Sequence, residues 1–220
     1  MPPHWKNVKR SADSSPRYRL MCGIGHDAEQ GRRTRESTLE DRIIAHCAPT
    51  LAGLKSACLF SYFYSDALSV KEELSRINGM LNGKGVFAEA LLWRGDFVLL
   101  YVYRMSQLRR ELTGPDAKEL LTEYGYLCDS VEGCLARLKE RLYDAPCFPH
   151  EIGIFLGYPP EDVKGFIRNG GRNCKCCGIW KVYCDAAEKE ALFHKLKKCT
   201  KVYREVFAAG RNLVQMTVCA

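Results

Sequence analysis

The chain has 220 residues, of which 46% are hydrophobic and 12 are cysteine, and its net charge is +7 at pH 7. This length and composition predict one globular domain with a substantial core. The sequence has no apolar run near the roughly 20 residues of a membrane span, and its polar start lacks the apolar centre of a secretory signal. We therefore expect a cytoplasmic protein without membrane contact, in which cysteines are free thiols or metal ligands more often than disulfides.

Residues 1–36 predict a disordered basic tail, and we place the folded domain at 37–220. The tail is polar and aperiodic, and its eight Lys and Arg against four Asp and Glu supply +4 of the net charge of +7. A nucleic-acid-binding protein usually carries a basic face on its folded domain. The position of the charge therefore argues against nucleic acid as a partner.

The domain is expected to open with a helix and a strand. Ser37 is followed three residues later by Glu40, which is a capping-box pattern at a helix start. The helix is expected to end before Pro49, because the residue before a proline avoids helical geometry. The aromatic and apolar run 57–64 is short, which favours a strand.

A second helix and a β-hairpin follow. The helix is expected over 69–81, with Ser69 as its N-cap. The apolar runs 86–93 and 97–103 are joined by the tripeptide 94–96, Arg-Gly-Asp, and predict two antiparallel strands.

The second half of the domain predicts mainly helices bounded by Gly and Pro. Proline at a first helical position and glycine after the last one mark the clearest boundaries. Helices are expected over 106–112, 115–124, 130–143, 151–156, 160–169 and 186–208, and strands over 179–184 and 213–218. The predicted class is α/β (or α+β), a single domain whose mixed sheet of about five strands contains an antiparallel hairpin and is flanked by helices.

The candidate metal ligands are Cys174 and Cys177, which form a C-x-x-C on a predicted loop. Thiolates at that spacing can both reach one tetrahedral metal, with iron or zinc as the candidate cofactor. A zinc ribbon needs a second close pair, which the sequence lacks, so a third ligand would have to come from Cys184, Cys147 or His150. A reactive dithiol and inert thiols on a tight turn are the alternatives.

The candidate catalytic residues are Cys47, His150 and Glu151. The neighbour of Cys47, His46, points about 100° away from it on a helix, so a basic partner has to come from elsewhere, such as His150. The unperturbed pKa of a histidine suits acid–base chemistry near neutral pH. Packing is the alternative role for Cys47, and a favourable position at a helix start is the alternative for Glu151.

Four residues are candidates for binding a flat ligand or cofactor: Lys55, Tyr158, Trp180 and Lys181. Aromatic side chains beside a Pro-rich loop line either a ligand cleft or a core. Consecutive residues on a strand point to opposite faces, so one of Trp180 and Lys181 is buried and the other solvated, or both border a cleft at the end of a sheet. The Gly-rich phosphate-binding motifs are absent from the sequence.

Five segments carry a family resemblance. They are HCAPTLAGLKSACLF (46–60), LLYVYR (99–104), FPHEIGIFLGYPPEDVKGFI (148–167), CGIWKVYCD (177–185) and KKCTKVYREV (197–206). With these motifs the chain, from about residue 37 to its end, resembles an uncharacterised family of cytoplasmic proteins found mainly in anaerobic bacteria. The family is catalogued as a domain of unknown function. The chain departs from it at Ser56, where the family often has proline.

The resemblance implies a role in anaerobic iron or thiol-redox handling, because such proteins are often encoded near flavodoxins and ferrous-iron uptake genes. The first hypothesis is therefore an accessory protein for iron, other metal or thiol-redox chemistry. The second is a small-molecule-binding enzyme or sensor with a cleft at the 148–160 loop and Trp180. The third is an interaction module for an acidic, flavodoxin-like redox protein. Added salt should weaken this association.

Overall fold

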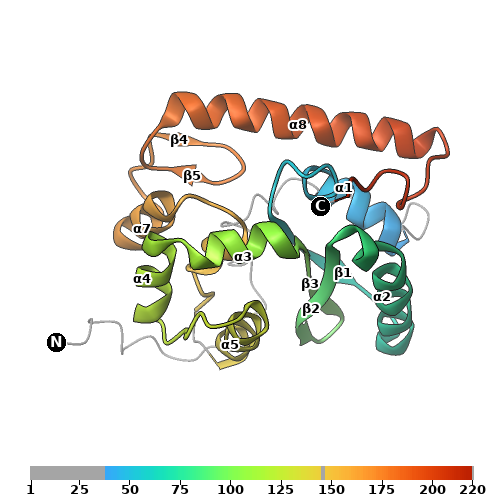
Figure 1. Cartoon of the computed structure of the whole chain (residues 1–220), viewed down its shortest axis with the longest axis horizontal. Helices are drawn as coiled ribbons and strands as arrows, with labels where there is room; N and C mark the ends of the chain where they lie inside the picture. The colour runs from blue at the N-terminus through green and yellow to red at the C-terminus, as the bar shows by residue number, and fades with distance from the viewer. Residues whose placement is uncertain (1–37, 145–146, 220) are drawn as a thin grey trace.

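The computed structural model describes residues 38–144 and 147–219 (Figure 1). The predicted tail, 1–36, lies outside the described residues. The elements are α1 (Leu39–Leu51), β1 (Ala57–Phe63), α2 (Ala67–Leu81), the 3₁₀ turn η2 (Asn82–Lys84), β2 (Val86–Arg94), β3 (Phe97–Arg104), α3 (Met105–Thr113), α4 (Pro115–Glu123), α5 (Val131–Asp144), α6 (Ile152–Phe155), α7 (Pro160–Asn169), β4 (Cys176–Cys177), β5 (Lys181–Val182) and α8 (Ala186–Ala208).

The five described strands form two antiparallel sheets, and the class is α+β. The larger sheet has the order β1-β3-β2, with Phe60 opposite Leu100. The expected hairpin is β2–β3, and its register shifts between Ala90 and Leu92. The smaller sheet pairs β4 with β5. The predicted class, the total of about five strands and the hairpin are therefore confirmed, but the strands form two antiparallel sheets and not one mixed sheet.

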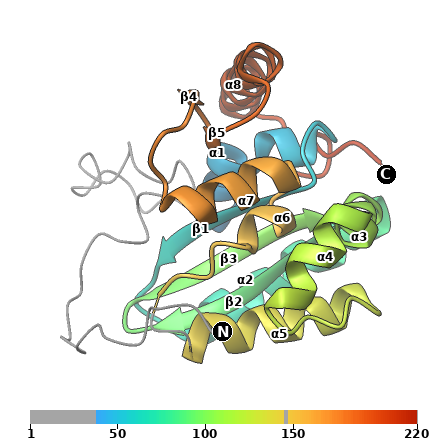
Figure 2. The same ribbon diagram turned by 90° about the vertical axis from the view of Figure 1, so that its left-hand side faces the viewer.

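Two hydrophobic cores lie on opposite faces of the larger sheet. Along β3, Leu100 and Val102 face a core built with α1 and α2, which we call the α1 core. Leu99 and Tyr101 face a core built with α3 to α7, which we call the α5 core. Figure 2 shows α1 and α5 on either side of the sheet. Because β3 is covered on both faces, its residues read as a continuous apolar run.

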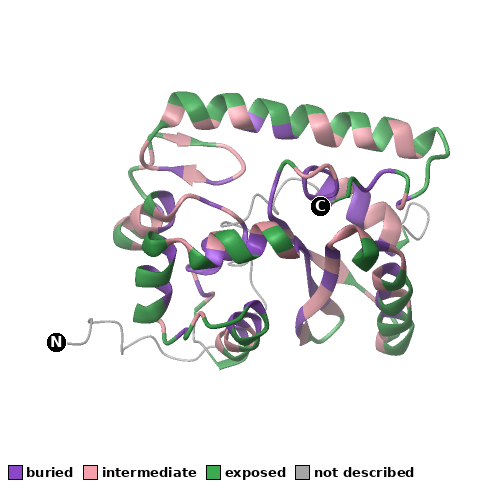
Figure 3. Ribbon diagram, in the orientation of Figure 1, coloured by how far each residue is buried: buried purple, intermediate pink, exposed green. Residues whose placement is uncertain are grey.

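The long helix α8 spans both cores. Figure 1 shows it running above the β4–β5 hairpin at one end and above α1 at the other. It contributes Phe193 to the α5 core, while Tyr203 and Phe207 pack against the α1 core. Its outer side is largely exposed (Figure 3). In the described part of the chain, no helix is long and apolar enough to cross a membrane.

Helix α1 differs from its prediction at both ends. The N-cap is Thr38, whose hydroxyl accepts from the Asp41 N–H at 3.2 Å while the Asp41 carboxylate accepts from the Thr38 N–H at 2.8 Å. The expected end before Pro49 is wrong, because the helix continues to Leu51. Proline leaves the carbonyl four residues earlier without its helical donor, and the Arg204 guanidinium of α8 donates to that carbonyl, on Ala45, at 3.2 Å. A contact from distant sequence thus supports the proline inside the helix.

Helix α2 starts earlier than expected, and strand β5 is shorter than expected. The N-cap of α2 is Asp66 rather than Ser69, because the Asp66 carboxylate accepts from two N–H groups of the first turn. The strand expected over 179–184 is confined to Lys181–Val182. The next two N–H groups donate to the Asp162 carboxylate, so they are not available to a strand partner.

The strand expected over 213–218 is wrong. The described residues there form turns, and the buried Leu213 and Met216 are three positions apart instead of alternating. The Thr217 hydroxyl donates to the Leu213 carbonyl at 2.8 Å, which closes a turn. Arg104, at the end of β3, then fixes this segment by donating to the Val218 carbonyl at 2.7 Å.

Candidate functional site

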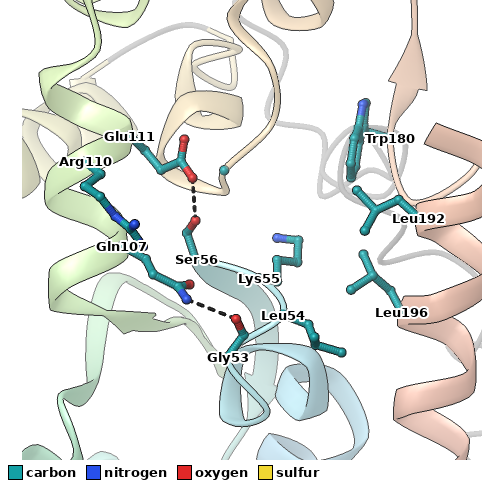
Figure 4. A pocket seen from close by; sticks show the side chains of 11 residues that line it. Gly53, Leu54, Lys55, Ser56, Gln107, Arg110, Glu111, Trp180, Leu192 and Leu196 are labelled. Carbon is teal, nitrogen blue, oxygen red and sulfur yellow. Dashed lines mark hydrogen bonds between the residues drawn. The ribbon is translucent and has the colours of Figure 1, made fainter. Parts of the chain in front are cut away.

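A cavity of about 270 Å³ lies between the loop after α1, helix α3 and helix α8 (Figure 4). Its lining residues are Gly53, Leu54, Lys55, Ser56, Gln107, Arg110, Glu111, Gly157, Trp180, Leu192 and Leu196. One wall is polar and comes from the loop and α3, and the other is apolar and comes from Trp180 and α8. We call this cavity the Lys55 pocket.

Hydrogen bonds between the loop and α3 hold the polar wall of the Lys55 pocket. The Ser56 hydroxyl donates to the Glu111 carboxylate at 2.7 Å, and the Gln107 amide donates to the Gly53 carbonyl at 3.0 Å (Figure 4). Gly157 closes the same wall with a φ of +70°, and a Cβ there would stand 2.7 Å from the Ser56 hydroxyl. Only glycine fits this conformation and this approach without displacement of the wall.

The Lys55 ammonium is buried beside the pocket. It donates to the Leu156 carbonyl at 2.7 Å and to the Ala57 carbonyl, and it lies 5.0 Å from the centroid of the Tyr158 ring. A buried cation is costly unless dipoles surround it, and here two carbonyls and an aromatic face provide them. The geometry therefore fixes a positive charge at a defined point of the pocket wall.

Trp180 forms the apolar wall together with Leu192 and Leu196 of α8 (Figure 4). Its ring stacks on Tyr158 at a centroid distance of 4.6 Å, and Phe193 meets it edge-on at 4.6 Å. Its indole N–H donates to Asp162. Because three contacts hold the ring, Trp180 has a fixed orientation in this wall.

A second, much smaller cavity of about 30 Å³ adjoins the Tyr158–Trp180 pair and contains His150 and Lys181. Burial lowers the pKa of His150, and the nearby Glu151 opposes this only in part. The ring meets Phe166 edge-on at 5.2 Å, and its Nδ1 has no hydrogen-bond partner among the described residues. The Lys181 ammonium donates to the Gly171 carbonyl at 2.7 Å. A cavity of this size holds about one water molecule.

The Glu151 side chain is held by contacts within the protein core. Its carboxylate is buried, pairs with the Arg141 guanidinium, and accepts from the Tyr126 hydroxyl at 3.2 Å. The candidate catalytic role of Glu151 stays a prediction, and the ion pair gives the side chain a packing function.

The structure brings Cys47 to Cys58 and places His150 elsewhere. Cys47 is fully buried in the α1 core, and Cys58 of β1 packs against the same core. His150 lies next to residues of the α5 core, on the other face of the sheet. The arrangement therefore does not bring together the Cys47–His150 pair considered from the sequence.

Cys174 lies two residues before β4 and is half-buried, and Cys177 is the last residue of β4 and is exposed. Across residues 38–144 and 147–219, no three His, Cys, Asp or Glu side chains are grouped so as to hold a metal ion. The role of Cys174 and Cys177 as metal ligands stays a prediction.

The family match covers most of the chain and not one motif alone. Residues 43–217, which run from the first turns of α1 to the segment held by Arg104, match the family described as "Protein of unknown function (DUF3793)". The chain belongs to the DUF3793 family. This confirms the family resemblance seen in the sequence. No curated protein and no solved structure matches the chain.

No pattern in the sequence indicated that α3 contributes to the Lys55 pocket of this DUF3793 protein. Gln107, Arg110 and Glu111 read as the polar face of an amphipathic helix, and nothing local shows which residues that face meets. The Cys47–Cys58 pair had a weak signal, since both thiols lie within the same short motif. Recognising it required the knowledge that the loop between them folds α1 back onto β1.

Proposed function

We propose that the protein binds a small organic anion with a flat apolar part in the Lys55 pocket. The single observation that carries this proposal is the fixed Lys55 ammonium facing a cavity whose opposite wall is Trp180. Ligand pockets commonly combine an apolar lining with a few placed polar groups. Lys55 and Trp180, two of the four candidate ligand-binding residues, line this pocket, and Tyr158 packs against both of them.

The charges around the pocket favour an anion. Lys55 and Arg110 contribute two positive charges, while the one acid in the lining, Glu111, accepts a hydrogen bond from Ser56. Arg110 is exposed at the rim, where its planar guanidinium suits a carboxylate or a phosphate. An anionic group at this wall would leave the flat part of the ligand against Trp180.

The volume limits the ligand. A cavity of about 270 Å³ is close to the lower end of the roughly 300–1,000 Å³ range of small-molecule sites. It suits one ring system with an acidic substituent and is too small for a dinucleotide. A sensor or an enzyme acting on such a compound fits the site.

A docking role for an acidic, flavodoxin-like protein in the cytoplasm is a second candidate. The observation that favours it is the exposed lysine face on α8, which includes Lys195, Lys198 and Lys201. Electrostatic docking of this kind weakens as salt rises. Binding of a purified flavodoxin that is equally strong at low and high salt would contradict it.

The ligand proposal is tested with 1-anilinonaphthalene-8-sulfonate, a fluorescent probe with a flat apolar body and one sulfonate. We expect saturable one-to-one binding, and quenching of Trp180 in a protein that carries Trp5→Phe and Trp93→Phe. Arg110→Glu should weaken binding about 5-fold, because reversing one nearby exposed charge changes the interaction by about 1 kcal/mol. The matched control is Arg109→Glu on the same helix, since Arg109 is exposed and outside the pocket lining. Equal affinities in the two variants would overturn the proposal.

A further inference from the structure

We propose that the ligand of the Lys55 pocket is a small aromatic amino acid, whose carboxylate lies toward Lys55 and Arg110 and whose ammonium lies toward Glu111. This inference rests on the proposed function, because it concerns the same cavity. The proposed function needs only an anionic group and a flat apolar part. The inference adds a cationic group to the ligand and so names its chemical class.

Glu111 is a carboxylate without a counter-charge in the fold. It lies in the last turn of α3, and the helix macrodipole disfavours a negative charge at that end. It forms no ion pair with any residue of the described ranges. A purely anionic ligand would add a second negative charge to this wall. A ligand that also carries a cationic group supplies the missing counter-charge.

The contact with Ser56 leaves half of the Glu111 carboxylate for a ligand. The Ser56 hydroxyl donates to Oε1 of Glu111 at 2.7 Å. Oε2 accepts no hydrogen bond from the residues that the structure describes, although each carboxylate oxygen can accept one or two. A neutral acceptor would hold the Ser56 hydroxyl as well. The contact with Ser56 therefore explains neither the charge nor the second oxygen.

Gln107 brings another acceptor to the same wall. It lies four residues before Glu111 on α3, so the two side chains share one face of the helix. Its amide nitrogen donates to the Gly53 carbonyl at 3.0 Å, which fixes the orientation of the amide. The amide oxygen accepts no hydrogen bond within the described ranges. Because an ammonium group has three donors, Glu111 and Gln107 can accept two of them.

The carboxylate of the ligand has its own partners nearby. Lys55 directly precedes Ser56, the residue that is hydrogen bonded to Glu111, and Figure 4 shows Lys55 and Glu111 on either side of Ser56. Arg110 precedes Glu111 and is exposed at the rim. Charges of opposite sign therefore reach the cavity from neighbouring positions. An α-amino acid carries its carboxylate and ammonium on one carbon atom, which matches this arrangement.

The apolar wall determines the side chain of the ligand. Trp180, Leu192 and Leu196 lie across the cavity from the charged wall (Figure 4). The Trp180 indole N–H already donates to Asp162 at 2.8 Å, so the ring offers an apolar surface and no donor. A second charged group on the ligand would have no partner at this wall. The wall therefore favours one aromatic ring over an acidic or basic side chain.

The test compares three ligands by isothermal titration calorimetry: L-phenylalanine, 3-phenylpropanoate, which lacks the ammonium, and 2-phenylethylammonium, which lacks the carboxylate. We expect L-phenylalanine to bind about 10-fold more tightly than either of the others, because each of them loses the hydrogen bonds of one charged group. L-phenylalanine should also displace 1-anilinonaphthalene-8-sulfonate, which occupies the same cavity under the proposed function.

Glu111→Gln tests the partner of the ammonium. Glutamine keeps one oxygen for the Ser56 hydroxyl and replaces the other with an NH₂ group, which cannot accept. L-phenylalanine should bind about 10-fold more weakly. 3-Phenylpropanoate should bind at least as tightly as to the wild type, because a negative charge has been removed. The matched control is Glu123→Gln, at an exposed position at the end of α4 and outside the pocket lining, which should change neither affinity.

Two results would overturn the inference while the proposed function stands, with 1-anilinonaphthalene-8-sulfonate bound as expected. One is L-phenylalanine binding no more tightly than 3-phenylpropanoate. The other is a Glu111→Gln protein that loses affinity for both carboxylates equally. If neither the sulfonate probe nor any of the three ligands binds, the proposed function fails as well. The ligand series on the wild type decides the first point even where Glu111→Gln impairs folding.

Discussion

Asp162 and Trp180 are joined by a buried hydrogen bond in which the indole N–H donates to the Asp162 carboxylate at 2.8 Å. The second oxygen of this carboxylate accepts from the backbone N–H groups of Tyr183, at 2.7 Å, and Cys184, at 3.2 Å. A single side chain at the start of α7 therefore fixes both the β4–β5 hairpin and the aromatic wall of the Lys55 pocket. The position of the Trp180 ring therefore depends on the position of the Asp162 carboxylate.

Replacement of Asp162 with asparagine should destabilise the protein and loosen Trp180. Asparagine keeps one oxygen for the backbone N–H groups but turns an NH₂ group toward the indole N–H, so that bond is lost. The expected cost is about 1–3 kcal/mol of the free energy of unfolding, measured by urea denaturation. The fluorescence emission of Trp180 should also change, measured in a protein that carries Trp5→Phe and Trp93→Phe. Glu161→Gln, at the exposed neighbouring position, is the control. Equal stability of the two variants would contradict the role of Asp162.

The buried ion pair of Glu151 and Arg141 allows a second prediction. Arg141→Met leaves the Glu151 carboxylate buried without its cation, and loss of one partner of a buried pair typically costs about 3–5 kcal/mol. Adding Glu151→Leu should recover part of this loss, because the uncompensated charge is then gone. Urea denaturation of the two single variants and the double variant measures the coupling.

The control for this pair is Lys201→Met, since Lys201 and Glu205 lie 4.0 Å apart with both side chains exposed. An exposed pair contributes less than about 1 kcal/mol. If Arg141→Met and Lys201→Met had similarly small effects, Glu151 would not depend on Arg141, and a catalytic role for Glu151 would regain support.

Arg104 carries a third prediction. Its guanidinium donates to the carbonyls of Thr50 at 2.5 Å, Leu51 at 2.6 Å and Val218 at 2.7 Å, and so ties the end of α1 to the C-terminal segment. Arg104→Lys keeps the charge but cannot reproduce the planar fork. We expect a loss of about 1–3 kcal/mol of stability and faster protease cleavage after residue 210. Arg211→Lys, at an exposed position, should do neither.

Elements with local boundary signals could be predicted from the sequence. Helix α7 has the predicted bounds 160–169, because proline begins it and Gly170, with a φ of +57°, ends it. The hairpin β2–β3 follows from two apolar runs and a short polar turn. In these cases the information lies within a few residues of the boundary.

Elements that depend on distant partners could not be predicted. The segment 213–218 has strand-like composition, but its place is set by Arg104, more than 100 residues earlier in the chain. Likewise, α1 continues through Pro49 with Arg204 of α8 donating to the carbonyl that the proline leaves free. Propensity is a weak prior that such tertiary contacts override.

The residues of the candidate site likewise fall into those with a local signal in the sequence and those placed by distant contacts. Lys55 and Trp180 of the Lys55 pocket stood out in the sequence, because both lie in or beside distinctive short motifs. The contribution of α3 and the separation of Cys47 from His150 follow from the packing of helices on opposite faces of one sheet. That choice of face is a property of the whole fold.

The pH dependence of Cys58 alkylation by iodoacetamide is the last prediction. Since the thiolate is the reactive form, the rate should rise with pH and reach half its maximum near pH 6, the pKa to which Cys47 and Lys55 lower Cys58 against the effect of burial. Cys199 on α8 is the internal control, because burial raises its pKa above the usual value and its rate should still be rising at pH 9. Cys47→Ala removes the largest influence and should move the Cys58 midpoint upward by at least one pH unit, about 1.4 kcal/mol in thiolate stability. Peptide-level mass spectrometry follows both thiols in one sample, and identical profiles for Cys58 and Cys199 would contradict a stabilised thiolate at Cys58.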